Sequence, residues 1–454
     1  MHITVYKTDQ SGLRLQRIIQ EPMRYQNTDV IHGVDHSHDV ESSLINLHPD
    51  VEYQRFGGMG GAINDTTATN WVQMPKELQE QFVQAYFDPK KGIGYHLTRV
   101  CIGSCDFSAA DYTYTEDGDV TLDTFSLAHD EQAVFPLIRA ANQYTALKVL
   151  ASPWSPPAYM KTNNSRIGGK LKSECYELWA KYFMKYIDVC REHGISIWGV
   201  TIQNEPRHHQ LWESCLYTPD EEAEFLGVLG KELEGAGVKI LCYDHCRERV
   251  YERAKQIFAH ENGKYCDGIA NHWYSGDHFG ELRAFYHKFP DKISYADEGC
   301  CAIVGVGIRE DVELPHAERY AHDIMGAFRN GLTHYCDWSM LLIDENCPYH
   351  NREGRGCNAD AAVFYDRNSG RLVFRLAYYY IGHISKFVRP GARVIACSSY
   401  APQVECVAFK NPDNTVVAVL LNRTDKSERA VLRLDNHIKE LELTAHSIVT
   451  AVIG

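Results

Sequence analysis

Residues 196–206 read SIWGVTIQNEP, a short apolar run that stops at polar residues. A run of roughly four to eight apolar residues bounded in this way is typical of a buried strand. Seven further runs of this kind occur between about residue 55 and residue 340, and longer amphipathic stretches separate them. They begin near Phe56 and continue as HLTRVCIG (96–103), ALKVLAS (146–152), VKILCYD (238–244), DGIANHWY (267–274), KISYADE (292–298) and LTHYCDW (332–338). The pattern therefore predicts eight strands joined by helices.

Helix signals lie between these runs. Pro75 opens one stretch that continues to about Phe87, and residues 174–191 repeat apolar side chains at helical spacing. The segment TPDE (218–221) is a capping signature in which Thr218 is the expected N-cap. Eight strands that alternate with helices over about 285 residues favour a (β/α)8 TIM barrel.

The two ends of the chain have a different pattern. Residues 381–454 contain short alternating runs such as VECVAFK and TVVAVLLN, which indicate strands. Residues 1–50 contain two such runs, HITVYK and SLINLHP, and are too few to fold alone. We therefore expect residues 1–50 and 381–454 to form an attached β-sandwich domain built from both termini, and residues 51–380 to form the barrel.

The composition excludes several classes of protein. The chain has 454 residues, of which 44% are hydrophobic and 23% charged, as in ordinary globular proteins. Its 60 acidic and 46 basic residues give a net charge of -14, so a nucleic-acid partner is not expected. No stretch approaches the roughly 20 apolar residues of a membrane span. The odd number of cysteines, 15, and an amino terminus without an apolar leader predict a cytoplasmic protein with reduced thiols.

Two of the predicted strands end on a glutamate. Glu205 follows the fourth strand, and Glu298 ends the seventh. Catalytic groups of this barrel class project from the carboxyl ends of the strands, so both glutamates are expected at one mouth. Two carboxylates there are what glycoside hydrolysis requires. Asp297 competes with Glu298, because strand alternation lets only one of the two point inward at a given depth.

Several motifs resemble those of one known family. They are FGGMGGAIND (56–65), SPWSPP (152–157), QNEP (203–206), NHWY (271–274) and IGHISKFV (381–388). In this order they resemble glycoside hydrolase family 30, and its glucosylceramidase-like branch most. The resemblance implies a retaining mechanism with Glu205 as acid/base and Glu298 as nucleophile. Like charges about 5 to 5.5 Å apart are expected to raise the pKa of one carboxyl and keep it protonated for acid duty.

The same resemblance implies substrate-binding roles for seven further residues. Asp65 would accept hydrogen bonds from sugar hydroxyls, Asn204 would bind the 2-hydroxyl, and Arg99 would support the nucleophile. The aromatic side chains that would line the subsite are Trp154, Tyr274 and Trp338. His272 would lie behind the subsite. A turn carboxylate in a glycine-rich loop is the alternative for Asp65. A plain surface or salt-bridge arginine is the alternative for Arg99.

The chain departs from the glucosylceramidase-like branch at two places. Residues 344–350 follow Trp338-Ser339 where that branch has a glycine-rich loop, and Gly299-Cys300 follow Glu298 where Ala-Cys is usual. These differences concern recognition of the leaving group more than the hydrolytic pair.

The residues and the resemblance favour a cofactor-free retaining β-glycosidase that acts on an exposed β-glucosyl unit of a small or oligosaccharide glycoside. β-Xylosidase, β-fucosidase and endo-β-1,6-glucanase activities are the alternatives within the family. A non-catalytic carbohydrate-binding protein is the alternative of another class. No metal site is predicted, because Cys242, His245 and Cys246 lack paired CxxC spacing and HExxH is absent.

Overall fold

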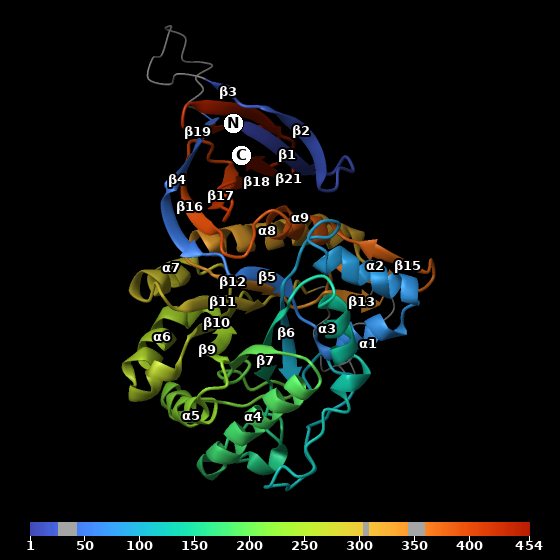
Figure 1. The fold of residues 1–454 in the computed structure, drawn as a ribbon, viewed down its shortest axis with the longest axis vertical. Helices are drawn as coiled ribbons and strands as arrows, with labels where there is room; N and C mark the ends of the chain where they lie inside the picture. The colour runs from blue at the N-terminus through green and yellow to red at the C-terminus, as the bar shows by residue number, and fades with distance from the viewer. Residues whose placement is uncertain (26–42, 303–307, 344–358) are drawn as a thin grey trace. The chain divides into compact units, whose positions relative to one another are not determined.

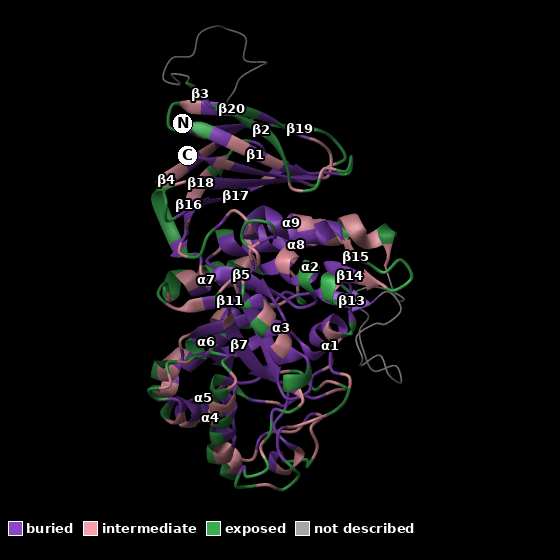
Figure 2. Cartoon of the chain, turned by 45° about the vertical axis from the view of Figure 1, so that its right-hand side comes forward, coloured by how far each residue is buried: buried purple, intermediate pink, exposed green. Residues whose placement is uncertain are grey.

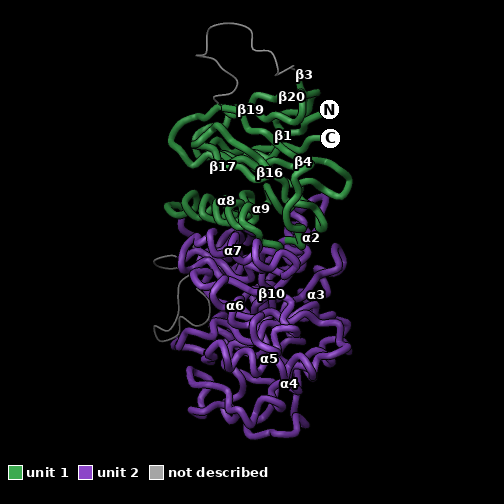
Figure 3. The backbone as a smooth tube through the Cα atoms, turned by 90° about the vertical axis from the view of Figure 1, so that its left-hand side faces the viewer, with its two compact units in different colours: residues 1–58, 310–333, 374–454 green, residues 59–309, 334–373 purple. Residues whose placement is uncertain are grey.

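The computed structural model describes residues 1–25, 43–302, 308–343 and 359–454. The chain divides into two compact units, which Figure 3 shows in different colours. The first unit comprises Met1–Gly58, Glu310–Thr333 and Phe374–Gly454, and the second comprises Met59–Arg309 and His334–Val373. Each unit is therefore assembled from segments far apart in the sequence. The boundaries expected at residues 50 and 380 stay predictions.

The second unit is built on a closed eight-stranded barrel, in which β5 to β12 follow one another in chain order (Figure 1). The pairings recorded between its neighbouring strands are parallel. The strands are β5 (Gly58–Gly61), β6 (Leu97–Ile102), β7 (Lys148–Pro153), β8 (Ile197–Thr201), β9 (Lys239–Cys246), β10 (Gly268–His272), β11 (Ile293–Glu298) and β12 (His334–Asp337). They coincide with the eight apolar runs, so the predicted barrel is confirmed.

Burial on both faces explains why these strands are nearly continuous apolar runs. Six of them each contribute one buried side chain to a cluster that includes Leu97, Leu150 and Leu241. Such layers fill the interior of a small barrel, and helices cover the outer face. Figure 2 shows the barrel strands labelled there, β5, β7 and β11, as mostly buried.

Seven helices of the second unit are α1 (Asp65–Gln73), α2 (Lys76–Phe87), α3 (Val134–Ala141), α4 (Tyr176–Glu192), α5 (Pro219–Glu232), α6 (Val250–Ala259) and α7 (Phe279–Lys288). The start of α5 is the predicted capping box: Glu221 N–H donates to the Thr218 hydroxyl, and Thr218 N–H donates to the Glu221 carboxylate. Pro75 is the N-cap of α2, one position before the helix that it was expected to open. A small sheet adds β13 (Leu341–Ile343), β14 (Val363–Asp366) and β15 (Arg371–Phe374).

The first unit contains a ten-stranded sheet in the order β2-β1-β21-β18-β17-β16-β4-β19-β20-β3. Its strands are β1 (His2–Thr8), β2 (Gln16–Pro22), β3 (Arg24–Tyr25), β4 (Leu44–Arg55), β16 (Arg393–Ser399), β17 (Val404–Lys410), β18 (Val416–Asn422), β19 (Glu428–Leu434), β20 (His437–Leu443) and β21 (Ser447–Ile453). Side chains from both ends of the chain, such as Ile3, Leu47 and Leu420, share one core. The predicted sandwich domain built from both termini is thus confirmed. Helices α8 (Glu313–Arg329) and α9 (Leu376–Ser385) complete this unit.

The thirteen cysteines in the described part of the chain are free thiols. Among the described helices, none has the length and the hydropathy needed to cross a bilayer. The expected cytoplasmic location stays a prediction.

Candidate active site

The two predicted glutamates lie beside one imidazole. Glu205 follows β8 and Glu298 ends β11, both at carboxyl ends of barrel strands. His272, the last residue of β10, places Nδ1 3.3 Å from Glu205 Oε1 and Nε2 3.9 Å from Glu298 Oε2. Two glutamates 93 residues apart in the sequence, as 298 minus 205 gives, therefore meet at one buried side chain.

Arg99 holds the Glu298 side of this site. The guanidinium is fully buried on β6, and its Nη1 donates to Glu298 Oε2 at 2.5 Å. Its Nη2 donates to both carboxylate oxygens of Asp244, at 2.8 and 2.9 Å, and to Asn204 Oδ1 at 3.0 Å. A buried guanidinium needs such partners, because an unpaired charge there would carry the full cost of desolvation. Arg99 thus does not lie on the surface; it forms buried salt bridges, one of them with Glu298.

Asp297 also reaches Arg99, although strand alternation predicted that only one of the neighbouring carboxyls would point inward. Its Oδ2 lies 3.2 Å from Arg99 Nε, and the residue is fully buried. The cause is an irregularity between β10 and β11: Asn271 pairs with Ala296, but His272 pairs with Glu298. The shifted register breaks the alternation at the strand end. Burial raises the pKa of Asp297, which favours its neutral form beside Asp244.

Glu205 is held differently, on the loop between β8 and α5. Its backbone is in the left-handed region, with φ 47°, and its N–H donates to the carbonyl of Asp244 at 2.8 Å. Asp244 is left-handed as well, with φ 43°. A non-glycine residue with positive φ costs free energy and tends to occur at functional sites. His208 Nδ1 and Gln210 Nε2 lie 3.1 and 2.9 Å from Glu205 Oε2.

The electrostatics of the pair differ from the expectation. Burial acts to raise the pKa of Glu205, but hydrogen bonds from His208 and His272 hold it well below its usual range. Burial, assisted by the charge of Glu205, raises the pKa of Glu298 despite His272 and Arg99. The expectation that repulsion would leave the acid/base with the raised pKa is therefore wrong, because histidine donors surround Glu205. Burial opposes protonation of His272, yet Glu298 and Asp244 raise its pKa well above the usual value.

Two predicted tryptophans pack on Arg99. Trp154 and Trp338 stack with their ring centroids 5.2 Å apart, and the guanidinium carbon lies 4.9 and 5.4 Å from the two rings. Both side chains are 1% exposed. Tyr274 is 43% exposed, and its hydroxyl donates to Glu298 Oε1 at 3.0 Å. The structure thus brings Arg99, Asn204, His272, Tyr274 and both tryptophans to the two glutamates.

Asp65 has no recorded contact with either glutamate in the described part of the chain, and its substrate-binding role stays a prediction. It is the first residue of α1, where its Oδ2 accepts the Ala109 N–H at 3.1 Å and its Oδ1 lies 3.1 Å from His129 Nε2. A second carboxyl to consider is that of Asp106, in the segment after β6. Burial and the charges of Glu298 and Glu205 raise its pKa well above the usual value. Asp106 forms no ion pair or hydrogen bond with another side chain in the described part of the chain.

Sequence reasoning missed Asp244, Asp106, His208 and Gln210. Asp244 had a signal, because the run VKILCYD ends on this carboxylate just as another run ends on Glu298. Asp106 lies four residues after β6 and could have been found by reading every strand end in the same way. His208 and Gln210 lie in a loop whose path the sequence does not predict. Residues 344–350, where the chain departs from its relatives, lie outside the described residues.

Two groups of side chains in the described residues have metal-ligating atoms within 4.8 Å of one another. The group formed by Asp244, His272 and Asp297 is bound to the cation Arg99, and the pKa of its imidazole is raised well above the usual value, which disfavours a metal ion there. The other group, Glu205, His208 and His245, has no recorded contact with Arg99 in the described residues, although Glu205 lies beside His272. No cofactor-binding motif was predicted.

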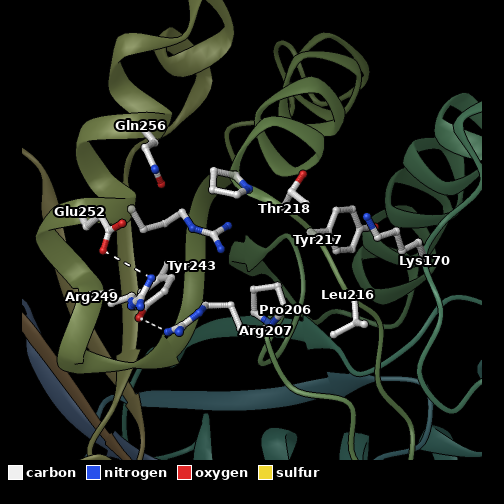
Figure 4. A pocket seen from close by; sticks show the side chains of 12 residues that line it. Lys170, Pro206, Arg207, Leu216, Tyr217, Thr218, Tyr243, Arg249, Glu252 and Gln256 are labelled. Carbon is white, nitrogen blue, oxygen red and sulfur yellow. Dashed lines mark hydrogen bonds and ion pairs between the residues drawn. The ribbon is translucent and has the colours of Figure 1, made fainter.

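A separate cavity of about 440 Å³ lies beside the same loop (Figure 4). Pro206, Arg207 and Tyr243 form part of its lining, but neither Glu205 nor Glu298 does. Its basic residues are paired with carboxylates: Lys170 with Glu221, Arg207 with Glu248, Arg249 with Glu252, and Arg253 with Glu222. The chemistry therefore belongs to the cluster around His272.

An eight-stranded parallel barrel with two glutamates at the carboxyl ends of its strands is the arrangement of a large class of glycosidases. The family model described as "Glycosyl hydrolase family 30 TIM-barrel domain" matches residues 56–388. The model of the same family's beta sandwich domain matches residues 391–451. The chain belongs to glycoside hydrolase family 30, as its motifs predicted. It is therefore a glycosidase, an O-glycosyl hydrolase that acts on glycoside substrates.

Relatives of known structure or name cover most of the chain. Lysosomal acid glucosylceramidase of Mus musculus is 32% identical over 410 residues, which are 84% of this chain and 78% of that protein. The crystal structure of SrfJ from Salmonella typhimurium has a TM-score of 0.91 and 33% identity, and covers 100% and 99% of the two chains. An endo-β1,6-glucanase structure has a TM-score of 0.87 and 25% identity, with the same coverage.

Proposed function

We propose that this protein is a retaining β-glycosidase in which Glu298 is the nucleophile and Glu205 is the acid/base. The observation that carries the proposal is the contact of both carboxylates with His272, while only Glu298 is bonded to Arg99. Arg99 lowers the pKa of Glu298 against the larger effect of burial, and in this way supports the ionised form that a nucleophile requires. Histidine donors around Glu205 can exchange protons, as an acid/base requires.

The proposed reaction has two displacements. Glu298 attacks the anomeric carbon, the bond to the leaving oxygen breaks, and Glu205 delivers its proton to that oxygen. Turnover proceeds through the protonation state in which Glu205 holds the proton and Glu298 is ionised. In the second step Glu205 takes a proton from water, which attacks the anomeric carbon and releases Glu298. The ester carries no charge, so one source of repulsion on ionised Glu205 is removed.

A β-glucosyl unit is the proposed substrate. Its support is the identity of 32% with a glucosylceramidase and the closeness of Asn204, Tyr274 and Asp106 to the pair. We assign to Asp106 the hydroxyl-binding role expected of Asp65, because Asp65 is engaged with His129. An endo-β-1,6-glucanase is the second candidate, favoured by the 25% identity with such an enzyme over the whole chain.

A substrate panel separates these candidates. Aryl β-glucoside, β-xyloside, β-fucoside and β-galactoside, a β-1,6-glucan and glucosylceramide in detergent would be compared by kcat/KM. The proposal expects the β-glucoside to lead among the aryl substrates. Release of internal fragments from β-1,6-glucan would establish the second candidate. A protein that binds these sugars and hydrolyses none would be a carbohydrate-binding protein instead.

A further inference from the structure

The loop that carries Glu205 contains a ligand set that the proposed hydrolysis does not use. One ligating atom each of Glu205, His208 and His245 lies within 4.8 Å of the others. Glu205 and His208 share the loop after β8, and His245 is on β9. The hydrogen bond from Glu205 N–H to the Asp244 carbonyl ties the two segments together next to the three side chains.

His245 is the unusual member of this set. It is 1% exposed, and its Nδ1 is buried without a hydrogen-bond partner among the described residues. A buried polar atom without a partner costs free energy, and a native structure retains one where a ligand or a function uses it.

His208 supplies a second imidazole, and its exposed side chain makes the ligand set accessible to a metal ion from solvent. Its ring lies edge-on to that of His245, with centroids 4.4 Å apart, and its side chain is 47% exposed. Within the described residues, its side chain hydrogen-bonds Glu205 and Gln210, both through Nδ1. An exposed side chain on a loop can rotate at little cost. A metal ion arriving from solvent would therefore reach His208 first.

Two imidazoles and one carboxylate are the donors that Zn²⁺ accepts with a further position left for water. Ligand atoms about 2.1 Å from a tetrahedral zinc ion lie about 3.4 Å apart, so the atoms farthest from one another need to close by up to about 1.4 Å, which rotation of the exposed His208 side chain can supply. We propose that Zn²⁺ binds Glu205, His208 and His245 and reversibly inhibits the enzyme. The inhibition rests on the proposed function, because a metal-bound carboxylate cannot hold the proton that the acid/base delivers.

The test measures zinc binding and turnover separately. The protein is stripped with EDTA, and zinc binding is followed by equilibrium dialysis while aryl β-glucoside turnover is titrated with Zn²⁺. We expect one equivalent of zinc to bind, turnover to fall as it binds, and EDTA to restore it. In His245→Asn the inhibitory zinc concentration should rise at least about tenfold relative to that variant's own metal-free rate.

His209→Asn is the matched control, because His209 is an exposed neighbour on the same loop outside the ligand set. It should retain the zinc sensitivity of the wild type. His208→Asn gives the same test at an exposed position if His245→Asn fails to fold. Unchanged inhibition in both ligand variants would overturn the inference, and so would an intense thiolate band on adding Co²⁺, which would place the metal on cysteines.

The two proposals fail in different ways. Glu298→Gln, which the proposed function makes inactive, should still bind one zinc ion. Zinc binding at the three residues without inhibition would leave the metal site standing and contradict the role of Glu205 as acid/base. Normal turnover with no zinc binding would overturn the metal site alone.

Discussion

The two carboxylates of the active site are supported by different parts of the barrel. Glu298 ends a strand and is fixed by Arg99 from a second strand, with no loop residue between them. Glu205 sits on a loop in a strained conformation, and its partners His208 and Gln210 come from the same loop. The strand side therefore offers a fixed charge, and the loop side offers groups that titrate and move. This difference matches what a nucleophile and an acid/base need.

Removal of the nucleophile should have the largest effect. Glu298→Gln keeps the size of the side chain and removes its charge, so kcat for an aryl β-glucoside should fall by at least about 10³-fold, or about 4 kcal/mol. Glu192→Gln, at the exposed end of α4, should leave kcat unchanged. Near-normal turnover by Glu298→Gln would show that Glu298 is not the nucleophile.

Arg99→Met should affect both activity and folding. Removing one partner of a buried charge network costs about 3 to 5 kcal/mol, because Asp244 and Glu298 lose their cation. Urea unfolding should show this loss, and kcat should fall by about 10²-fold. Arg191→Met removes an exposed pair with Asp188 and should change the free energy of unfolding by less than about 1 kcal/mol. Equal free energies of unfolding of the two variants would contradict the claim that the buried ion pairs of Arg99 stabilise the protein.

Tyr274→Phe tests the exposed support of Glu298. The variant loses the hydroxyl that donates to Glu298 Oε1. A hydrogen bond to a charged group contributes about 1.5 kcal/mol, so kcat should fall about tenfold. Tyr400→Phe, at a residue that is 61% exposed, is the control. A kcat equal to that of the control would show that Tyr274 does not act on the nucleophile.

His208→Ala tests the loop side through the pH profile, measured with EDTA present. The hydrogen bond from His208 lowers the pKa of Glu205 by favouring its ionised form. The acid step needs protonated Glu205, so kcat/KM should decline as the pH rises through the pKa of Glu205. Losing His208 raises that pKa and should move the alkaline limb to higher pH. His209→Ala should leave the limb in place, and a downward shift in His208→Ala would contradict the account.

Thr218→Ala should have the smallest effect, at the end of the loop that carries Glu205. The hydroxyl of Thr218 caps α5, and its loss should lower the free energy of unfolding by about 1 kcal/mol without changing kcat. Thr218→Ser keeps the cap and should stay within a few tenths of a kcal/mol of the wild type. A large loss of kcat in Thr218→Ala alone would mean that the cap positions the loop for catalysis.

The fold could be predicted because burial of a strand or of one helix face determines where apolar residues occur along the sequence. Runs such as SIWGVTIQ are apolar on both faces because barrel strands are covered on both sides. The same rule led to Glu205 and Glu298, since strand ends determine where catalytic side chains gather. The cap at Thr218 was predicted for a local reason: its partner is three residues away.

The rest depends on contacts that the sequence does not encode locally. The register shift that lets Asp297 and Glu298 both reach Arg99 arises from the pairing of two strands. The pKa order of the pair depends on His208 and His272, which come from different segments. Asp106 was not considered, because it lies outside the motifs and its electrostatic coupling to Glu205 and Glu298 depends on the fold. His245 was considered only with cysteines close to it in the sequence, whereas its neighbours in space are Glu205 and His208.

The stereochemistry of the first product tests the central claim most directly. Hydrolysis of an aryl β-glucoside by the wild-type enzyme would be followed by proton NMR from the first turnovers. Because Glu298 forms a covalent intermediate that water opens from the same face, the account predicts β-glucose first, with the α-anomer appearing only through mutarotation. The appearance of α-glucose first would contradict it.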